Sequence, residues 1–218
     1  MSDWSHRELE GLRREYDRDQ LNESGLPADP LMLIETWLKE AVSSDSPDPT
    51  AMTLTTVDAG GVPSSRIVLL KQIQHKQLVF YTNYQSKKAR QIKGNSNVAA
   101  HFFWPLLERQ VKISGRAEIL EDAGSDSYFS SRPFESKVAA WASPQSEVIP
   151  DREYLEREYQ NYLKNFEVTG RVPRPPEWGA IAIWPMRMEF WQGGRYRLHD
   201  RIEYTRSEKG WSRVRLAP

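Results

Sequence analysis

Short apolar stretches follow one another from residue 51 to the C-terminus, each bounded by turn-forming residues, and this feature restricts the fold most strongly. Runs of about four to eight apolar and β-branched residues between such boundaries are typical of strands joined by hairpins. The pattern predicts strands at 52–57, 65–73, 78–82, 97–103, 109–120, 178–191, 196–205 and 211–216. The run at 65–73 is almost continuously apolar, which predicts cover on both of its faces. We therefore expect a mainly β (α+β) protein with one closed or partly open antiparallel, Greek-key-like barrel.

Helical patterns lie before and between these strands. Capping-box spacing from Ser5 to Glu8, followed by apolar residues up to Tyr16, predicts a short amphipathic helix. Asp29 and Pro30 have the residue types of an N-cap and a first helical position, and they predict a second helix. Its core face would contain Leu33, Ile34, Trp37, Leu38 and Val42. Further helices are predicted at 86–95, at 150–166 and, interrupted by Pro133, between 122 and 143.

Composition argues against several classes of protein. The 218 residues carry 30 basic and 30 acidic side chains, and the formal charge of zero disfavours a nucleic-acid binder. Cysteine is absent, which excludes disulfides, thiolate metal sites and cysteine nucleophiles, and a reducing cytoplasm is the expected location. We expect neither a signal peptide nor a membrane span, since no apolar run approaches roughly 18 residues. The four histidines are too scattered to predict a metal site, and common nucleotide-loop and hydrolase motifs are absent.

The segment EFWQGGRYRLHDR at 189–201 concentrates cationic groups near the C-terminus. If the residues after its Gly-Gly pair form a strand, one face carries Arg195, Arg197, His199 and Arg201. Neighbouring cations repel one another unless an anion lies across them, and guanidinium groups suit phosphate, carboxylate and flat rings. The pattern therefore indicates an anion-binding face, although a solvated strand face would show the same alternation.

Two other segments have the residue types of phosphate sites. The residues SKK at 86–88 open a predicted helix, whose N-terminal N–H groups and dipole attract anions. Tyr128, Arg132 and Ser136 are spaced i, i+4, i+8 and would clamp a phosphate monoester from one helix face, although Pro133 interrupts that helix. An ordinary capped surface helix and a chance spacing are the alternative interpretations.

Amide side chains could serve a flat heterocycle, because each both donates and accepts hydrogen bonds. The candidates are Gln110 on a strand and Gln145 with Ser146 in a loop, where ordinary polar surface residues are the alternative interpretation. Two phosphorylated ring compounds bound side by side would account for both phosphate sites, the arginine-rich face and the neighbouring Trp191.

Several long motifs occur in a fixed order along the chain. They are RIVLLK at 66–71, FYTN at 80–83, SKKARQI at 86–92, ERQVKISG at 108–115, YFSSRPFES at 128–136, AAWASPQS at 139–146, EFWQGGRYRLHDR at 189–201 and RLAP at 215–218. In this order they resemble the pyridoxamine 5′-phosphate oxidase family over about residues 12–218. One departure is Lys87, which stands where many members of that family have arginine, so that a bidentate fork becomes a point charge.

The resemblance implies an FMN-binding split barrel that works as a homodimer, with FMN at the subunit interface. It implies an N-terminal helical segment and mobile cover at 1–50, followed at 51–218 by the split-barrel domain with peripheral helices and C-terminal dimerisation strands. The residues that the resemblance assigns to FMN are Arg66, Ile67, Val68, Leu69, Leu70, Lys71, Tyr81, Thr82, Lys87, Lys88, Gln110, Gln145, Ser146, Trp191 and Arg201.

The implied substrates are pyridoxamine 5′-phosphate and pyridoxine 5′-phosphate, in the biosynthesis or salvage of vitamin B6, with neither nucleic acid nor membrane as a partner. The residues that the resemblance assigns to substrate are Arg13, Arg14, Glu15, Tyr16, Lys71, Tyr128, Arg132, Ser136, Arg197, Leu198 and His199. Among these, Arg197 and His199 are implied to be catalytic, over the pyridine ring. In the implied reaction a hydride passes from C4′ of the substrate to N5 of FMN, and O2 reoxidises the flavin. The products are pyridoxal 5′-phosphate, H2O2 and, from the amine, NH3.

Two alternatives retain a phosphate site. One is a different split-barrel flavoprotein, such as a flavin reductase that releases FMN, and the other is a non-catalytic carrier of pyridoxal 5′-phosphate. Neither explains two phosphate sites together with RLHDR at 197–201. Yellow colour and peroxide production from pyridoxine 5′-phosphate would separate the oxidase from both.

Overall fold

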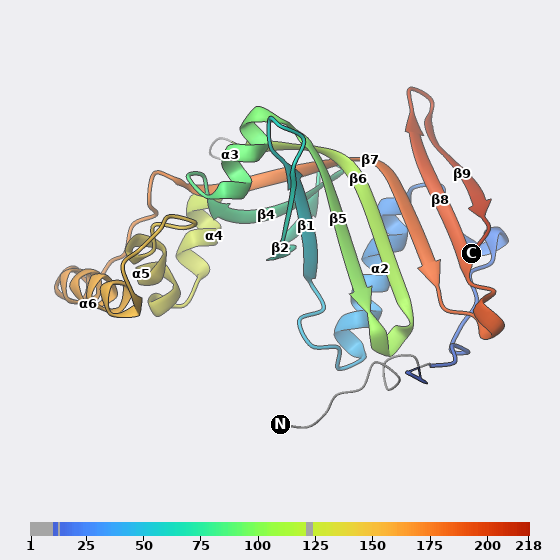
Figure 1. The fold of residues 1–218 in the computed structure, drawn as a ribbon, viewed down its shortest axis with the longest axis horizontal. Coiled ribbons are helices and arrows are strands. Elements are labelled where there is room, and N and C mark those ends of the chain that lie inside the picture. Colours follow the sequence, from blue (N-terminus) through green and yellow to red (C-terminus); the bar gives the residue numbers. More distant parts are fainter. Residues whose placement is uncertain (1–10, 13, 121–123) are drawn as a thin grey trace. The chain divides into compact units, whose positions relative to one another are not determined.

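The computed structural model describes residues 11, 12, 14–120 and 124–218 (Figure 1). These residues form two compact units. Unit 1 combines the N-terminal region up to Pro49 with Phe103–Lys112 and Arg187–Pro218. Unit 2 contains Thr50–Phe102 and Ile113–Met186. Segments that are far apart in the sequence therefore build each unit.

Antiparallel pairing dominates the sheet. Its strands are β1 (Ala51–Val57), β2 (Pro63–Leu69), β3 (Gln72–Gln74), β4 (Gln77–Asn83), β5 (Asn97–Trp104), β6 (Arg109–Leu120), β7 (Trp178–Gln192), β8 (Asp200–Ser207) and β9 (Gly210–Leu216). The main path runs β2-β1-β5-β6-β7-β4-β3, and β8 joins the last part of β7 and pairs with β9. The pairs β1–β2, β1–β5, β3–β4 and β4–β7 are antiparallel. The prediction of a mainly β fold with peripheral helices is confirmed, in its open rather than its closed form.

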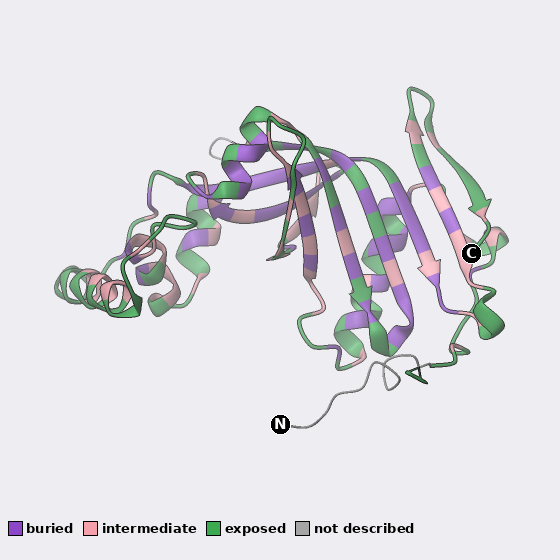
Figure 2. Ribbon diagram, in the orientation of Figure 1, coloured by how far each residue is buried: buried purple, intermediate pink, exposed green. Residues whose placement is uncertain are grey.

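The core of unit 2 follows from the apolar patterns of its strands. Burial alternates along β5, as the period of two requires for a strand with one covered face (Figure 2). In contrast, Leu78, Val79 and Phe80 of β4 and residues 180–183 of β7 are buried without alternation, so both faces are covered there. Each large apolar side chain that is fully buried contributes about 1.5–3 kcal/mol relative to exposure.

Strand β2 contradicts one prediction. Its apolar run was expected to have cover on both faces and to continue to residue 73, but it ends at Leu69 and alternates between exposed and half-buried positions. Ile67 is 62% exposed and Leu69 is 40% exposed. The strand stands at the end of the path and, among the described residues, pairs only with β1. An apolar run alone could therefore not reveal which side chains find cover within one chain.

Helices of unit 2 confirm the expected breaks. They are α3 (Lys87–Gly94), α4 (Ser125–Ser131), α5 (Phe134–Ala142) and α6 (Arg152–Thr169), shown in green to orange in Figure 1. Pro133 separates α4 from α5 because proline has no backbone N–H to donate to a helical hydrogen bond. No described residue of α6 is fully buried, yet one side of the helix packs on α5, where Trp141 contacts Tyr162 and Phe166.

In unit 1, α2 (Pro30–Ser43) forms as predicted. The Asp29 side chain accepts from the Leu31 N–H, and Pro30 occupies the first helical position. Trp37 packs edge-on against Trp104 and Phe190, whose ring centroids lie 6.5 and 5.2 Å away. The prediction was wrong for Val42, which is 61% exposed because Ala41 takes the buried position instead.

The N-terminal prediction is only partly testable. Residues 5–10 and Arg13 lie outside the described residues, and Arg14, Glu15 and Tyr16 have no helical structure, contrary to the predicted helix. Short 3-10 turns at Glu23–Gly25 and Pro105–Leu107 complete this part of unit 1. Among the described helices, none has the length and apolar character needed to cross a bilayer.

Candidate functional site

A buried lysine marks the first group of site residues, in unit 2. The Nζ of Lys88 donates to Thr82 Oγ1 at 2.9 Å, to Gln145 Oε1 at 2.9 Å and to Ser86 Oγ at 3.2 Å. Burial, and secondarily the positive charge of Arg66, lower the pKa of Lys88 from 10.5 to about 8. No carboxylate contacts this ammonium group within the part of the chain that the structure describes. A buried cation among neutral acceptors is the setting in which an added anion is most strongly stabilised.

Arg66 on β2 provides a second cation to the same region. Its Nη1 donates to the Leu54 carbonyl at 3.1 Å and to Thr56 Oγ1 at 2.6 Å, and Thr56 in turn donates to Gln91. Burial lowers the pKa of Arg66. A carbonyl and a hydroxyl fix this guanidinium group without neutralising it, so the chemistry of the donor set fits a phosphate group.

The structure distinguishes the two predicted lysines. Lys87 is exposed in the first turn of α3, while Lys88 is buried. Ser86 occupies the N-cap position, but its hydroxyl makes no capping hydrogen bond and accepts from Lys88 instead. The predicted phosphate site at this helix N-terminus stays a prediction, and of its two lysines only Lys88 is buried.

An aromatic stack forms the second group of unit 2. The rings of Tyr81, Tyr128 and Trp178 are nearly parallel, with centroids 4.0 Å apart for the two tyrosines and 5.3 Å apart for Tyr81 and Trp178. The guanidinium of Arg132 lies 4.9 Å from the Trp178 ring centroid. Burial raises the pKa values of both tyrosines, so their hydroxyls stay protonated and can donate hydrogen bonds.

Arg132 has an unsatisfied donor. Its Nη1 is buried and has no hydrogen-bond partner among the described residues, and burial lowers the pKa of this guanidinium. Arg132 and Ser136 line one cavity of about 230 Å³. Tyr128, Arg132 and Ser136 were predicted to share a helix face; instead α4 ends at Ser131 and the aromatic stack brings Tyr128 to Arg132. A buried donor without a partner is rare in proteins, and a ligand atom would satisfy it.

The arginine-rich segment of unit 1 is not the predicted strand. Residues Arg195–Arg197 form a 3-10 turn in which Tyr196 and Arg197 have φ values of 58° and 65°, and β8 begins only at Asp200. Left-handed backbone breaks the alternation of a strand. The predicted common face of Arg195, Arg197, His199 and Arg201 is therefore wrong, and each has its own surroundings.

His199 belongs to an aromatic group with Trp191 and Tyr16. Ring centroids lie 4.7 Å apart for Trp191 and His199, and Tyr16 stands edge-on to both at 5.7 Å. The Gly194 N–H donates to Nδ1 of His199 at 3.1 Å, so this nitrogen is the unprotonated one. Burial, and then the charge of Arg197, lower the pKa of His199, which favours the neutral ring.

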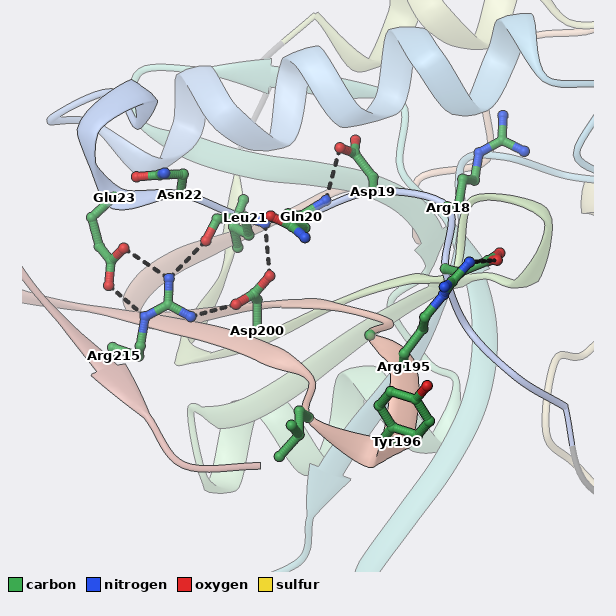
Figure 3. Close-up of a pocket in the computed structure, with 13 residues that line it drawn as sticks. Arg18, Asp19, Gln20, Leu21, Asn22, Glu23, Arg195, Tyr196, Asp200 and Arg215 are labelled. Atoms are coloured by element: carbon green, nitrogen blue, oxygen red, sulfur yellow. Dashed lines mark hydrogen bonds and ion pairs between the residues drawn. The ribbon is translucent and has the colours of Figure 1, made fainter.

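Several other cations in the described part of unit 1 have carboxylate partners. Arg201 forms a two-pronged ion pair with Glu189 at 2.9 and 3.1 Å, and Arg195 pairs with Asp17 at 2.8 Å. A cavity of about 840 Å³ lies beside residues 17–23, and Figure 3 shows Arg215 at its edge between Glu23 and Asp200. The carboxylates hold these arginines in place, which the sequence could not show.

The remaining predicted residues divide between the units. In unit 2, Leu70 is buried, whereas Lys71 and Ser146 are exposed, and Ser146 has left-handed backbone. In unit 1, Gln110 is half-buried, while Glu15, Arg197 and Leu198 are exposed. Val68, on β2 of unit 2, is half-buried.

Sequence reasoning missed the carboxylates that bind these cations. Glu108 and Glu189 are buried at 4% and 8% exposure, and both accept from arginine side chains. Both lie inside the motifs at 108–115 and 189–201, so the signal was an acidic residue within an otherwise basic and apolar segment. Thr56 and Gln91, which connect to Arg66, carried no such signal.

Comparison with models of known families shows which family the chain belongs to. A family model described as "Pyridoxamine 5′-phosphate oxidase" matches residues 38–164, which is more than half of the chain. The chain belongs to the pyridoxamine 5′-phosphate oxidase family. A second model, "Pyridoxine 5′-phosphate oxidase C-terminal dimerisation region", matches residues 178–218. The recognition of this family from the sequence motifs is confirmed, and the protein is an oxidoreductase.

Close relatives extend over the whole chain. A pyridoxine/pyridoxamine 5′-phosphate oxidase of Idiomarina loihiensis is 49% identical over 212 residues, covering 97% of this chain and 100% of the relative. Another, of Rubrobacter xylanophilus, is 47% identical over 219 residues and covers 100% of both chains. Among solved structures, PhzG from Burkholderia lata 383, in complex with tetrahydrophenazine-1-carboxylic acid, is similar with a TM-score of 0.85 and 29% identity. That match covers 92% of this chain and 98% of PhzG.

Proposed function

We propose that this member of the family oxidises pyridoxine 5′-phosphate and pyridoxamine 5′-phosphate to pyridoxal 5′-phosphate, with FMN as cofactor and O2 as electron acceptor. Pyridoxine 5′-phosphate and O2 give the aldehyde and H2O2. Pyridoxamine 5′-phosphate also takes up water and releases NH3. The reaction serves vitamin B6 biosynthesis or salvage, and the absence of cysteine supports a cytoplasmic location.

The observation that carries this proposal is the buried, unsatisfied Nη1 of Arg132. The guanidinium lies against the Trp178 ring, and a cavity that Ser136 also lines adjoins it. A phosphate monoester would satisfy Nη1 and neutralise a charge whose burial is otherwise unfavourable. A phosphorylated substrate therefore fits better than a neutral one of similar shape.

The second cationic group fits the phosphate of FMN. Lys88 and Arg66 would hold it, with Thr82 and Ser86 as neighbouring hydroxyls and Gln145 as an amide partner. When bound, FMN supplies the two-electron acceptor that O2 reoxidises. The protein's own task is to hold the substrate in a reactive orientation and to present its cations to the phosphate groups.

Residues of unit 1 would serve the reacting ring. Neutral His199 keeps its Nδ1 on the Gly194 N–H, which leaves a hydrogen on Nε2 to donate to substrate. Arg197, exposed on a left-handed turn, would orient the pyridine ring by charge and hydrogen bonding. Tyr16 and Trp191 would exclude water beside His199. A strong general base is not needed for this assignment.

We include a homodimer in the proposal, with FMN at the subunit interface. Its support is the match of residues 178–218 to a C-terminal dimerisation region, together with the exposed Ile67 and Leu69 of β2. Apolar side chains exposed on an edge strand of a single chain are typical of surfaces that a second subunit covers.

The test uses purified protein, which should be yellow and should release peroxide when pyridoxine 5′-phosphate is added. Arg132→Met should raise KM for pyridoxine 5′-phosphate about 10- to 100-fold, because a lost hydrogen bond between charged groups costs about 1.5–3 kcal/mol. Bound FMN should stay at the level of the unmodified protein. Arg152→Met, which removes an exposed arginine of the same unit paired with Glu156, is the matched control and should leave KM unchanged. Yellow protein without peroxide, or an unchanged KM in Arg132→Met, would overturn the assignment.

A further inference from the structure

Glu108 is a buried carboxylate that the proposed mechanism does not use. Its side chain is 4% exposed, and it stands in left-handed backbone with φ 55° between the Pro105–Leu107 turn and β6. Few non-glycine residues adopt this conformation unless their surroundings require it. The position therefore calls for an explanation from its contacts.

The carboxylate receives three donors from one N-terminal segment. Oε1 accepts from Nη2 of Arg14 at 3.0 Å, and Oε2 accepts from the backbone N–H groups of Asp17 and Arg18 at 3.0 and 3.1 Å. Two successive backbone donors on one oxygen, with a guanidinium on the other, form an arrangement that only an ionised carboxylate satisfies fully.

The backbone of Glu108 holds a second segment. Its carbonyl oxygen accepts from the Gly193 N–H at 2.8 Å and from Nε2 of Gln192 at 3.3 Å. One residue thus connects residues 14–18 with the chain between Trp191 and His199, and all of these lie in unit 1.

Tyr16 lies where these two segments meet. A Cβ atom added to Gly193 would stand 2.8 Å from the Tyr16 Cβ, so the tyrosine packs directly on this glycine. Its ring contacts Trp191 and His199 edge-on. The position of Tyr16 therefore depends on both connections that Glu108 makes.

We propose that Glu108 is a positioning residue, which fixes residues 14–18 so that Tyr16 packs on Gly193 and against the Trp191–His199 pair. The kinetic consequence rests on the function proposed above, whereas the structural anchoring does not. Through Tyr16, Glu108 sets the orientation of His199 and the cover over the substrate without touching substrate itself.

Glu108→Gln is the sharpest variant, because it keeps the shape of the side chain and removes its charge. An amide can accept from only one side, so either Arg14 or the Asp17 and Arg18 N–H groups must face an NH2 group. Hydrogen exchange followed by mass spectrometry should show the Asp17 and Arg18 amides exchanging about tenfold faster or more, since they lose a charge-assisted hydrogen bond. In the same protein, KM for pyridoxine 5′-phosphate should rise several-fold while FMN content stays unchanged.

Glu118→Gln is the matched control, since this glutamate accepts from Gln77 in unit 2 and should change neither measurement. Gly193→Ala provides the complementary variant: the new Cβ displaces Tyr16, so KM should rise while the Asp17 and Arg18 amides remain protected. If Glu108→Gln does not fold, Glu108→Asp keeps the charge, shortens the side chain and should show the same two changes.

Unchanged exchange at Asp17 and Arg18 in Glu108→Gln would overturn the anchoring. Faster exchange with unchanged kinetic parameters would overturn the positioning role. If the unmodified protein does not oxidise pyridoxine 5′-phosphate, the proposed function fails, and the exchange measurement still decides whether Glu108 anchors the segment.

Discussion

Two cations of unit 2, Lys88 and Arg132, differ in their partners from several arginines of unit 1 and from Arg174 of their own unit, which pairs with Asp126. In unit 1, Arg109, Arg201 and Arg215 each contact at least one carboxylate. In unit 2, Lys88 and Arg132 contact neutral acceptors and aromatic rings, with no carboxylate partner among the residues described. Cations that already have partners stabilise the fold, whereas cations without them are available to an anionic ligand.

The pKa shifts have the corresponding signs. Hydrogen bonds to carboxylates raise the pKa values of Arg201 and Arg215 in unit 1. Burial lowers the pKa values of Arg66, Lys88 and Arg132 in unit 2. The folded chain therefore stabilises the charge of the first group and destabilises the charge of the second, which is the cost that a bound phosphate would offset.

The largest expected effect on stability comes from Arg109 in unit 1. Its guanidinium donates to Asp19, Glu40 and Gln192, and lies 4.6 Å from the Trp37 ring centroid. Arg109→Met should lower the free energy of unfolding by about 2–4 kcal/mol in urea denaturation, because it breaks a buried network whose carboxylates keep partial access to water. Arg152→Met removes an exposed pair with Glu156 and should change it by less than about 0.5 kcal/mol. Equal values for the two variants would show that the buried network of Arg109 contributes no more to stability than an exposed ion pair.

Lys88 gives an effect of intermediate size, seen in binding. Its folded pKa of about 8 lies below the ordinary 10.5, so the charged form that phosphate requires is lost as pH rises above 8. FMN affinity of the apoprotein should fall with rising pH above that value, by at most about tenfold per unit. Flavin fluorescence titration measures it. Lys88→Met should bind FMN weakly with little change across this pH range, while its apoprotein unfolds no more easily than the unmodified one.

The contribution of Lys88 to apoprotein stability changes with pH in the opposite direction to that of a lysine in an ordinary ion pair. Between pH 8 and 10.5 the unfolded chain keeps the proton that the folded chain has lost, so this contribution to stability rises with pH. A pH-independent FMN affinity in the unmodified protein would show that Lys88 is not part of the phosphate site.

Glu23 gives the smallest expected effect, although its pKa shift is large. Its bonds to Arg215 lower the pKa of this exposed carboxyl from 4.5 to about 2. Its contribution to stability is therefore complete above pH 4.5 and is lost as pH falls towards 2. Thermal melting of Glu23→Gln should show a small deficit at pH 5 that disappears near pH 2. A deficit that persists unchanged at pH 2 would mean that protonation of Glu23 is not its cause.

Local sequence determined most of the secondary structure. Asp29 and Pro30 started α2, Pro133 ended the helical stretch before α5, and alternating apolar residues placed β5 and β6, because these signals act within a few residues. The ordered motifs were also enough to recognise the family.

Tertiary structure alone decided which charges are neutralised and which are not. Glu108 binds Arg14, which is 94 positions away, and Glu189 holds Arg201 across the β7–β8 pair. Lys87 and Lys88 are adjacent residues of the same type, yet only Lys88 is buried. The charge on a side chain can be read from the sequence, but its free energy depends on solvent exposure and on partners that folding brings from distant segments.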